Sequence, residues 1–173
     1  MKATQKLHDI GQSLWLDNIT RGLLTTGTLR RLATWMLRLA LAFSFLSAVA
    51  DRFGLWGQFG AAGVAWGDFD RFTAYTARLL WFLPPSLVAP AAILATGAEL
   101  IVAGGLLVGW RLHWWAFAAA ALLLSFALTM SCALGVKAPL DYSVWTATAA
   151  AFLLGAVPVF EANKTRPGVS NRR

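Results

Sequence analysis

Long apolar runs divide this chain into four segments that predict membrane-spanning helices. Each run is close to the roughly 20 residues that an α-helix needs to cross a bilayer. The runs cover residues 32–50, 86–109, 114–136 and 142–160. They lack the period-two alternation of an outer-membrane β-barrel. We therefore predict an all-α integral membrane protein whose spans form a four-helix bundle.

The stretch between the first two runs, residues 51–85, predicts a structured loop on the outer side. Its first part interleaves glycine with large aromatic residues, which interrupts any long helix. Further on, Phe69, Phe72 and Leu79 fall on one helical stripe, and Asp68 and Asp70 suit the first turn of a helix. We expect an amphipathic interfacial helix here.

The two ends of the chain are more polar than the spans. Leu7, Ile10 and Leu14 recur at helical spacing, which predicts an amphipathic helical extension over residues 1–31. Residues 161–173 read as a basic tail. The predicted organisation is thus an extension at 1–31, a membrane domain at 32–160 and a tail at 161–173.

Composition agrees with a membrane protein. Hydrophobic residues make up 58% of the 173 residues and charged residues 13%, whereas soluble domains average roughly 25% charge. These values exclude a disordered chain and an ordinary soluble enzyme. The single cysteine, Cys132, excludes an intramolecular disulfide and a multi-cysteine metal site, and we predict no metal.

The net charge of +7 is best explained by membrane orientation. With the N-terminus in the cytoplasm, the 15 Lys and Arg residues divide 11 inside to 4 outside. The positive-inside rule therefore predicts that both termini lie in the cytoplasm. The expected partner of the basic residues is the lipid bilayer, and no nucleic acid is predicted.

The first span has an alternative interpretation as a signal peptide. Arg30 and Arg31 precede the apolar run, and Ala48, Val49 and Ala50 resemble a small-residue cleavage site. The preceding polar region, about 30 residues, is long for a signal peptide. Three further spans also make an uncleaved first helix the simpler expectation.

Two charged residues lie inside the predicted spans, Arg38 and Glu99. An unpaired ionisable group in a bilayer is costly, so such residues usually have partners. At 1.5 Å per residue, Glu99 lies about 15 Å and Arg38 about 9 Å from the same membrane face. We predict that they pair. The pair either locks the two spans together or lines a quinone or proton site.

A second candidate cluster lies at the outer boundary. Asp51 and Arg52 end the first span, and Lys137 and Asp141 flank a predicted tight turn between the third and fourth spans. If the bundle is compact, these four residues meet in the headgroup layer. They are expected to form a salt-bridge network or to dock a periplasmic or quinone partner.

Residues 8–32 carry a specific resemblance. The sequence HDIGQSLWLDNITRGLLTTGTLRRL is similar to the extreme N-terminus of bacterial transaldolases. The resemblance ends there, and the barrel strands and Schiff-base lysine of that family have no counterpart. A (β/α)₈ barrel needs about 250 residues. We expect a fragment without transaldolase activity.

From residue 36 to about 157 the chain resembles the DoxX/DoxD-like family of small bacterial membrane proteins. Four phrases carry the resemblance, in family order: LRLALAFSFLSAVADRFGLWG at 37–57, VAWGDFDRFTAYT at 64–76, ATGAELIVAGGLLVGWR at 95–111 and GVKAPLDYSVWTATAAAFLL at 135–154.

This resemblance implies a multi-pass protein of the bacterial inner membrane that is a membrane subunit or partner of a quinone- or thiol-linked oxidoreductase. No complete catalytic motif or cofactor-binding motif is present, so a quinone is the candidate cofactor and any redox reaction requires a partner subunit. The alternative is a non-catalytic membrane scaffold or small transporter.

Overall fold

The computed structural model describes the backbone of residues 26–164 and the side chains of residues 27–157. Within this range the chain is helical and contains no strand. The helices are α2 Thr26–Arg52, α3 Phe69–Leu79, α4 Pro85–Val108, α5 Leu112–Leu134, α6 Lys137–Asp141 and α7 Val144–Lys164. The predicted all-α class is confirmed. The amphipathic extension predicted for residues 1–31 lies largely outside the described residues.

Three of the helices are long and apolar enough to cross a membrane: Gly27–Arg52, Pro85–Val108 and Leu112–Leu134. They correspond to the first three predicted spans. The fourth predicted span falls on α7, whose apolar part with described side chains, Val144–Val157, is shorter. Large apolar side chains point outward from these helices, as expected for surfaces that contact lipid; examples are Phe43, Leu94 and Phe152.

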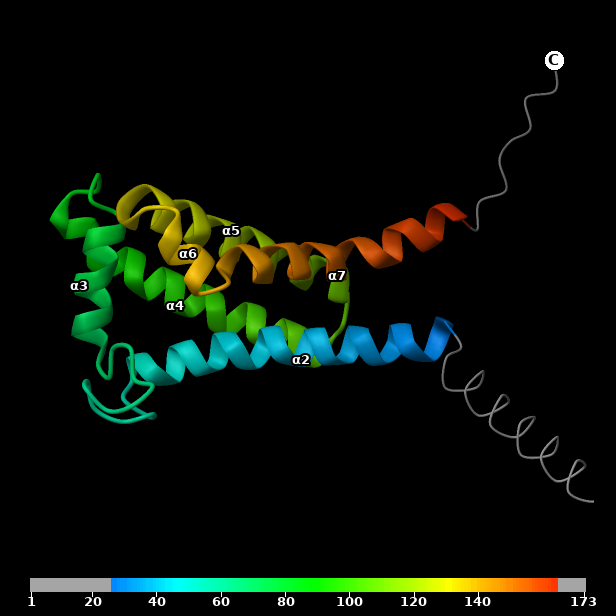
Figure 1. Ribbon diagram of the computed structural model, residues 1–173, viewed down its shortest axis with the longest axis horizontal. Coiled ribbons are helices and arrows are strands. Elements are labelled where there is room, and N and C mark those ends of the chain that lie inside the picture. Colours follow the sequence, from blue (N-terminus) through cyan, green and yellow to red (C-terminus); the bar gives the residue numbers. More distant parts are fainter. Residues whose placement is uncertain (1–25, 165–173) are drawn as a thin grey trace, which may run out of the picture. The chain divides into compact units, whose positions relative to one another are not determined.

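Residues 26–36 form the N-terminal turns of α2 and belong to a separate compact unit from residues 37–173. Within residues 37–173, α5 packs along α7 and against α4 (Figure 1). Small residues allow this packing: Ala116, Ala119 and Ala151 are fully buried. The core also includes Phe45 from α2 and Leu106 from α4.

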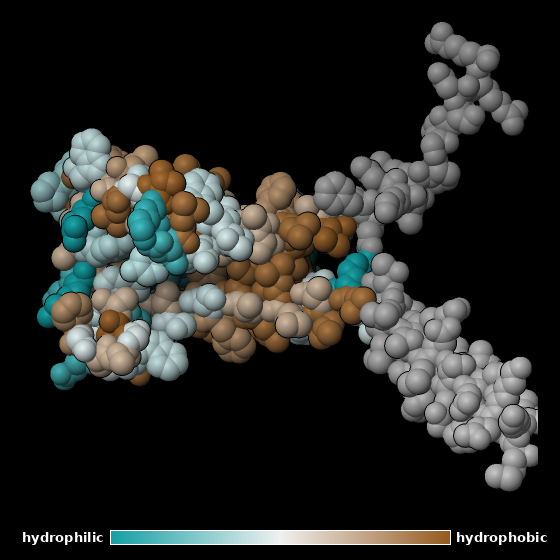
Figure 2. Space-filling view, viewed as in Figure 1, coloured by the Kyte–Doolittle hydropathy of each residue, from teal (hydrophilic) through white to brown (hydrophobic). Residues whose placement is uncertain are grey.

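Helix α3 lies across one end of the long helices and packs against α4 and α5 (Figure 1). We call this the α3 end. On the face shown in Figure 2, hydrophilic residues gather at this end, whereas hydrophobic residues cover the middle of the long helices. The predicted helix in the loop is therefore confirmed as α3, with Asp68 as its N-cap: the carboxylate accepts a hydrogen bond from the Arg71 N–H at 2.8 Å.

The segment between α2 and α3, residues 53–68, is irregular, as its glycines predict. Asp51 holds it against α2, because Oδ2 accepts hydrogen bonds from the backbone N–H groups of Ala65 at 3.0 Å and Trp66 at 3.1 Å. Gly67 has φ +72°, and an added Cβ would collide with the backbone of Phe59. The compact fold of this loop brings Trp66 to the C-terminal end of α2.

The connection between α5 and α7 differs from the prediction of a tight turn. Residues Lys137–Asp141 form the short helix α6. Pro139 is fully buried within it and packs the connection onto the helices. A proline in the first turn of a helix does not interrupt the hydrogen bonds, which explains why α6 forms despite it.

Candidate ligand cavity beside a buried ion pair

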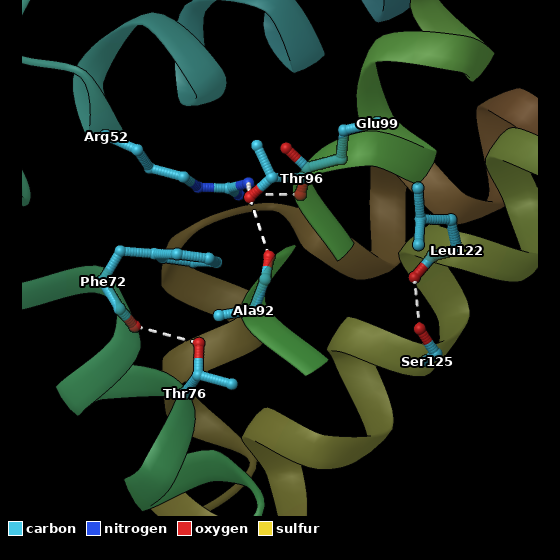
Figure 3. Close-up of polar contacts among 8 residues, drawn as sticks. All are labelled: Arg52, Phe72, Thr76, Ala92, Thr96, Glu99, Leu122 and Ser125. Carbon is cyan, nitrogen blue, oxygen red and sulfur yellow. Dashed lines mark hydrogen bonds and ion pairs between the residues drawn. The ribbon is translucent and has the colours of Figure 1, made fainter. Parts of the chain in front are cut away.

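A buried ion pair joins α2 to α4 near the α3 end. Arg52 Nη2 donates a hydrogen bond to Glu99 Oε1 at 2.7 Å, and Nη1 donates to Thr96 Oγ1 at 2.8 Å. The two ionic side chains are 3% and 1% exposed. Figure 3 shows the Arg52 guanidinium reaching across to Thr96 and Glu99 on the same face of α4.

Local sequence spacing explains this arrangement. Thr96 and Glu99 are three residues apart, so both face α2 from adjacent turns of α4. The Thr96 hydroxyl donates to the Ala92 carbonyl at 2.8 Å, which leaves an oxygen lone pair for Arg52 (Figure 3). Arg52 is the last residue of α2, and its long side chain extends back along the helices toward Glu99.

Aromatic rings cover the other side of the Arg52 guanidinium. Its central carbon lies 3.7 Å from the Phe72 ring centroid and 5.4 Å from that of Trp66. A cation over the face of an aromatic ring is stabilised by the ring quadrupole, more strongly where water is excluded. Arg52 thus connects α2, α3 and α4 through three different kinds of contact.

The pair retains unused hydrogen-bonding capacity. Arg52 Nε and Glu99 Oε2 are both buried, and neither has a hydrogen-bond partner in the described part of the chain. Such groups are uncommon in folded proteins because an unmet buried donor or acceptor costs free energy. One donor and one acceptor of the ion pair are therefore left without a partner among the described residues.

A cavity of about 840 Å³ adjoins Arg52. Its walls come mostly from α3, α4 and α5, and the loop between α2 and α3 adds Phe59, Ala65 and Trp66. Most of the lining is apolar; it includes Phe72, Leu79, Ala95, Leu122, Phe126 and Met130. Polar groups are few and include Thr76, Thr129 and Tyr75. Glu99 is not among the lining residues, so Arg52 is the member of the ion pair that lines the cavity. A mostly apolar cavity with a few placed polar groups is typical of a small-molecule site.

The ionic lining of this cavity is basic. Besides Arg52, the lining includes Arg71 and Arg78, both exposed, and none of the lining residues is acidic. Arg71 pairs with Asp68 at 2.9 Å and lies over the Phe59 ring. Burial raises the pKa of the Tyr75 phenol, with a further rise from Tyr142 that Arg78 partly opposes. Tyr75 therefore keeps its proton and remains a donor at neutral pH.

The predicted Glu99–Arg38 pair is wrong: the partner of Glu99 is Arg52. Arg38 instead donates hydrogen bonds from Nε and Nη2 to the carbonyls of Leu106 and Leu107 in the last turn of α4. Terminal carbonyls of a helix lack intrahelical partners and carry partial negative charge, so they attract a cation. Arg38 lies at the level of Leu106, seven residues from Glu99, which is about 10 Å along α4.

The predicted outer cluster separates into distinct interactions. Lys137 pairs with Asp141 within α6, and both side chains are exposed. Asp51 binds loop N–H groups and Arg52 binds Glu99. Among the described residues, no ion pair joins Asp51 or Arg52 to α6. Only Arg52 reaches the cavity.

Sequence reasoning missed several residues that form the site. Thr96 could have been found from its spacing to Glu99, since both lie on one helical face. Phe72 was placed correctly on the apolar stripe of α3, but its contact with a cation depends on how α3 lies across the other helices. Cys132 is exposed, and no cluster of three metal-binding side chains occurs among the residues described.

Comparison with protein-family models, curated proteins and solved structures finds no match for this chain. The DoxX/DoxD-like resemblance therefore rests on the phrases given above. Functional inference rests on the cavity and its ion pair.

Proposed function

We propose that this chain is a four-span membrane protein of the DoxX/DoxD-like kind in a bacterial inner membrane, with α2, α4, α5 and α7 as its spans. Outward-facing apolar residues on all four helices support this topology, including Phe43, Leu94, Leu128 and Phe152. The 11-to-4 distribution of basic residues supports cytoplasmic termini. In this orientation the α3 end faces outward.

We further propose that it is a membrane subunit or partner of a quinone- or thiol-linked oxidoreductase and that its cavity holds the quinone. The apolar cavity beside Arg52 is the observation that carries this proposal. Its volume of about 840 Å³ is in the range of small-molecule sites and accommodates a quinone ring with the start of its isoprenoid tail. A bound quinone supplies the redox chemistry, for which the chain has no recognisable motif of its own.

The residues of the cavity have complementary roles in this proposal. Arg52 offers a donor to a ring carbonyl, and Glu99 and Thr96 hold its guanidinium in one orientation. Tyr75 offers a second donor, since it keeps its proton at neutral pH. Phe126 and Met130 supply apolar surface for the ring. The partner subunit supplies or removes the electrons.

Quinone binding by the purified protein tests this proposal. Titration with a short-chain quinone, followed by quenching of tryptophan fluorescence, reports occupancy near Trp66, which lines the cavity. Ala95→Phe places a ring inside the cavity and should weaken binding at least tenfold. Leu94→Phe is the matched control, because Leu94 is 73% exposed and does not line the cavity. Equal binding by the two variants and the wild type would show that the quinone does not bind in this cavity.

A non-catalytic scaffold is the second candidate. The specific observation in its favour is that Arg52 contacts α2, α3 and α4 together, which would rigidify a platform at the α3 end. The quinone titration distinguishes the two candidates, because a scaffold binds no quinone in this cavity. If the chain is a scaffold, Ala95→Phe should also leave co-purification of the partner unchanged.

A further inference from the structure

A second hollow lies along α2 and shares no lining residue with the cavity beside Arg52. It is an open groove of about 600 Å³. Ala40, Ser44 and Ala48 recur at every fourth position and form its floor. Phe43 lies along its length, and Trp56 from the loop lines it near the α3 end. The groove thus runs along an apolar helix of membrane-spanning length.

Asp51 lines this groove and carries an unmatched charge. Its side chain is 5% exposed. Oδ2 accepts the two hydrogen bonds from the loop, but Oδ1 has no hydrogen-bond partner in the described part of the chain. None of the ion pairs formed by described residues includes Asp51, and its neighbour Arg52 is engaged by Glu99. A buried carboxylate in this state favours a cationic hydrogen-bond donor.

We propose that this groove binds a phospholipid whose headgroup carries a primary ammonium group. The shape and the charge of the groove support the same occupant. An acyl chain fits along Phe43 and the small residues of the floor, and the ammonium group reaches Asp51 at the α3 end beside the ring of Trp56. Tryptophan stabilises a nearby cation through its ring face and is common at membrane–water interfaces.

The chemistry of Asp51 distinguishes between lipid headgroups. A primary ammonium has three N–H donors and can complete the hydrogen bonding of Oδ1. A quaternary trimethylammonium carries the same charge but has no N–H donor, and an anionic headgroup is repelled. The site therefore selects phosphatidylethanolamine over phosphatidylcholine and phosphatidylglycerol. This inference does not depend on quinone binding in the other cavity.

Native mass spectrometry of the full-length protein tests the proposal with these three lipids at equal acyl composition. We expect phosphatidylethanolamine to be retained at least tenfold more tightly than phosphatidylcholine. Asp51→Asn should abolish this preference, because the amide is neutral while its carbonyl still accepts the loop hydrogen bonds. Asp70→Asn is the matched control: Asp70 is an exposed carboxylate near the same end, and its loss should leave the preference unchanged.

A second variant keeps the test decisive if Asp51→Asn does not fold. Ser44→Leu fills the floor of the groove without altering the carboxylate, and it should lower phosphatidylethanolamine retention to the level of phosphatidylcholine. Gly104→Leu enlarges an exposed residue of α4 and serves as its control. Equal retention of the three lipids by the wild type would overturn the proposal. So would a lower oligomeric mass of Ser44→Leu than of the wild type without any change in lipid retention, since a second copy of the chain would then occupy the groove.

Discussion

At the scale of single residues, Arg52 and Glu99 show how a largely apolar helical fold accommodates buried charge. Both side chains are almost completely buried, and their mutual contact is supplemented by Thr96 and by two aromatic rings. Removing either charge leaves the other without its partner in a medium of low dielectric constant. Replacing both residues with apolar ones leaves no buried charge without a partner. The free energy of unfolding should therefore respond very differently to single and double changes.

We predict that Glu99→Gln destabilises the protein by about 3–5 kcal/mol, the usual cost of breaking a buried ion pair. The double variant Arg52→Leu with Glu99→Leu should recover much of that loss. Thermal unfolding of Arg52→Leu, Glu99→Leu and the double variant gives the coupling energy of this pair. Strictly additive losses would show that the two residues act independently.

The exposed pair in α6 is the control for this cycle. Lys137 and Asp141 also form an ion pair, but their side chains are 85% and 56% exposed. Solvent screens such a pair, so Lys137→Ala and Asp141→Ala should each change stability by no more than about 1 kcal/mol. A large loss here would mean that α6 is held by its charges rather than by packing of Pro139.

A different effect is expected at Arg38, because its guanidinium donates hydrogen bonds to backbone carbonyls. Arg38→Met keeps much of the side-chain length but removes the donors to Leu106 and Leu107. We expect a loss of about 1.5–3 kcal/mol, the range for hydrogen bonds to charged groups. Glu99→Gln combined with Arg38→Met should give additive losses, since the structure does not bring these residues together. A coupling energy above about 0.5 kcal/mol, the usual limit for independent sites, would restore the original pairing hypothesis.

At the scale of helices, adjacent glycines of α4 have opposite roles. Gly105 is buried, and an added Cβ would collide with the ring of Trp115 on α5. Gly104 is exposed, and an added Cβ would meet nothing within 4 Å. The close approach of α4 and α5 therefore depends on one glycine of the pair.

We predict that Gly105→Ala lowers stability by about 1–3 kcal/mol, as overpacking of a core usually does. Gly104→Ala should be neutral or should raise stability by up to about 1 kcal/mol, because alanine favours the helix more than glycine does. Melting temperatures in detergent compare the two variants directly. The same loss in both would indicate that the backbone, and not the contact with Trp115, sets the effect.

At the scale of the whole molecule, the expected topology places the α3 end outside the cell and both termini inside. Replacing Cys132 with serine gives a background for single-cysteine labelling. We predict that Gln58→Cys reacts with a membrane-impermeant maleimide in intact cells. Asn171→Cys should react only after the membrane is opened. Labelling of Asn171→Cys in intact cells would reverse the orientation and place the cavity on the cytoplasmic side.

Much of the fold follows from local patterns in the sequence. Apolar runs of sufficient length predict α2, α4, α5 and α7, since a helix in lipid satisfies its own backbone groups and requires little else. The stripe of Phe69, Phe72 and Leu79 predicts α3 for a similarly local reason. α6 was not predicted, because five residues around Pro139 carry no periodic pattern.

The partners of the charged residues were decided by tertiary structure. The sequence identifies Arg38 and Glu99 as unusual because an unpaired ionisable group inside a bilayer is costly, and it places Arg52 at the outer boundary of the first span. Which cation meets Glu99 depends on the relative positions of α2 and α4 along their axes. Phe45 and Leu106 share the buried core, and Arg38 binds the carbonyls of Leu106 and Leu107 at the end of α4, so the groups that join these helices are remote in sequence. The cavity has the same origin, because α3, α4, α5, the loop after α2 and the ends of α2 and α7 all line it. No local pattern in the sequence predicts how far apart these elements lie.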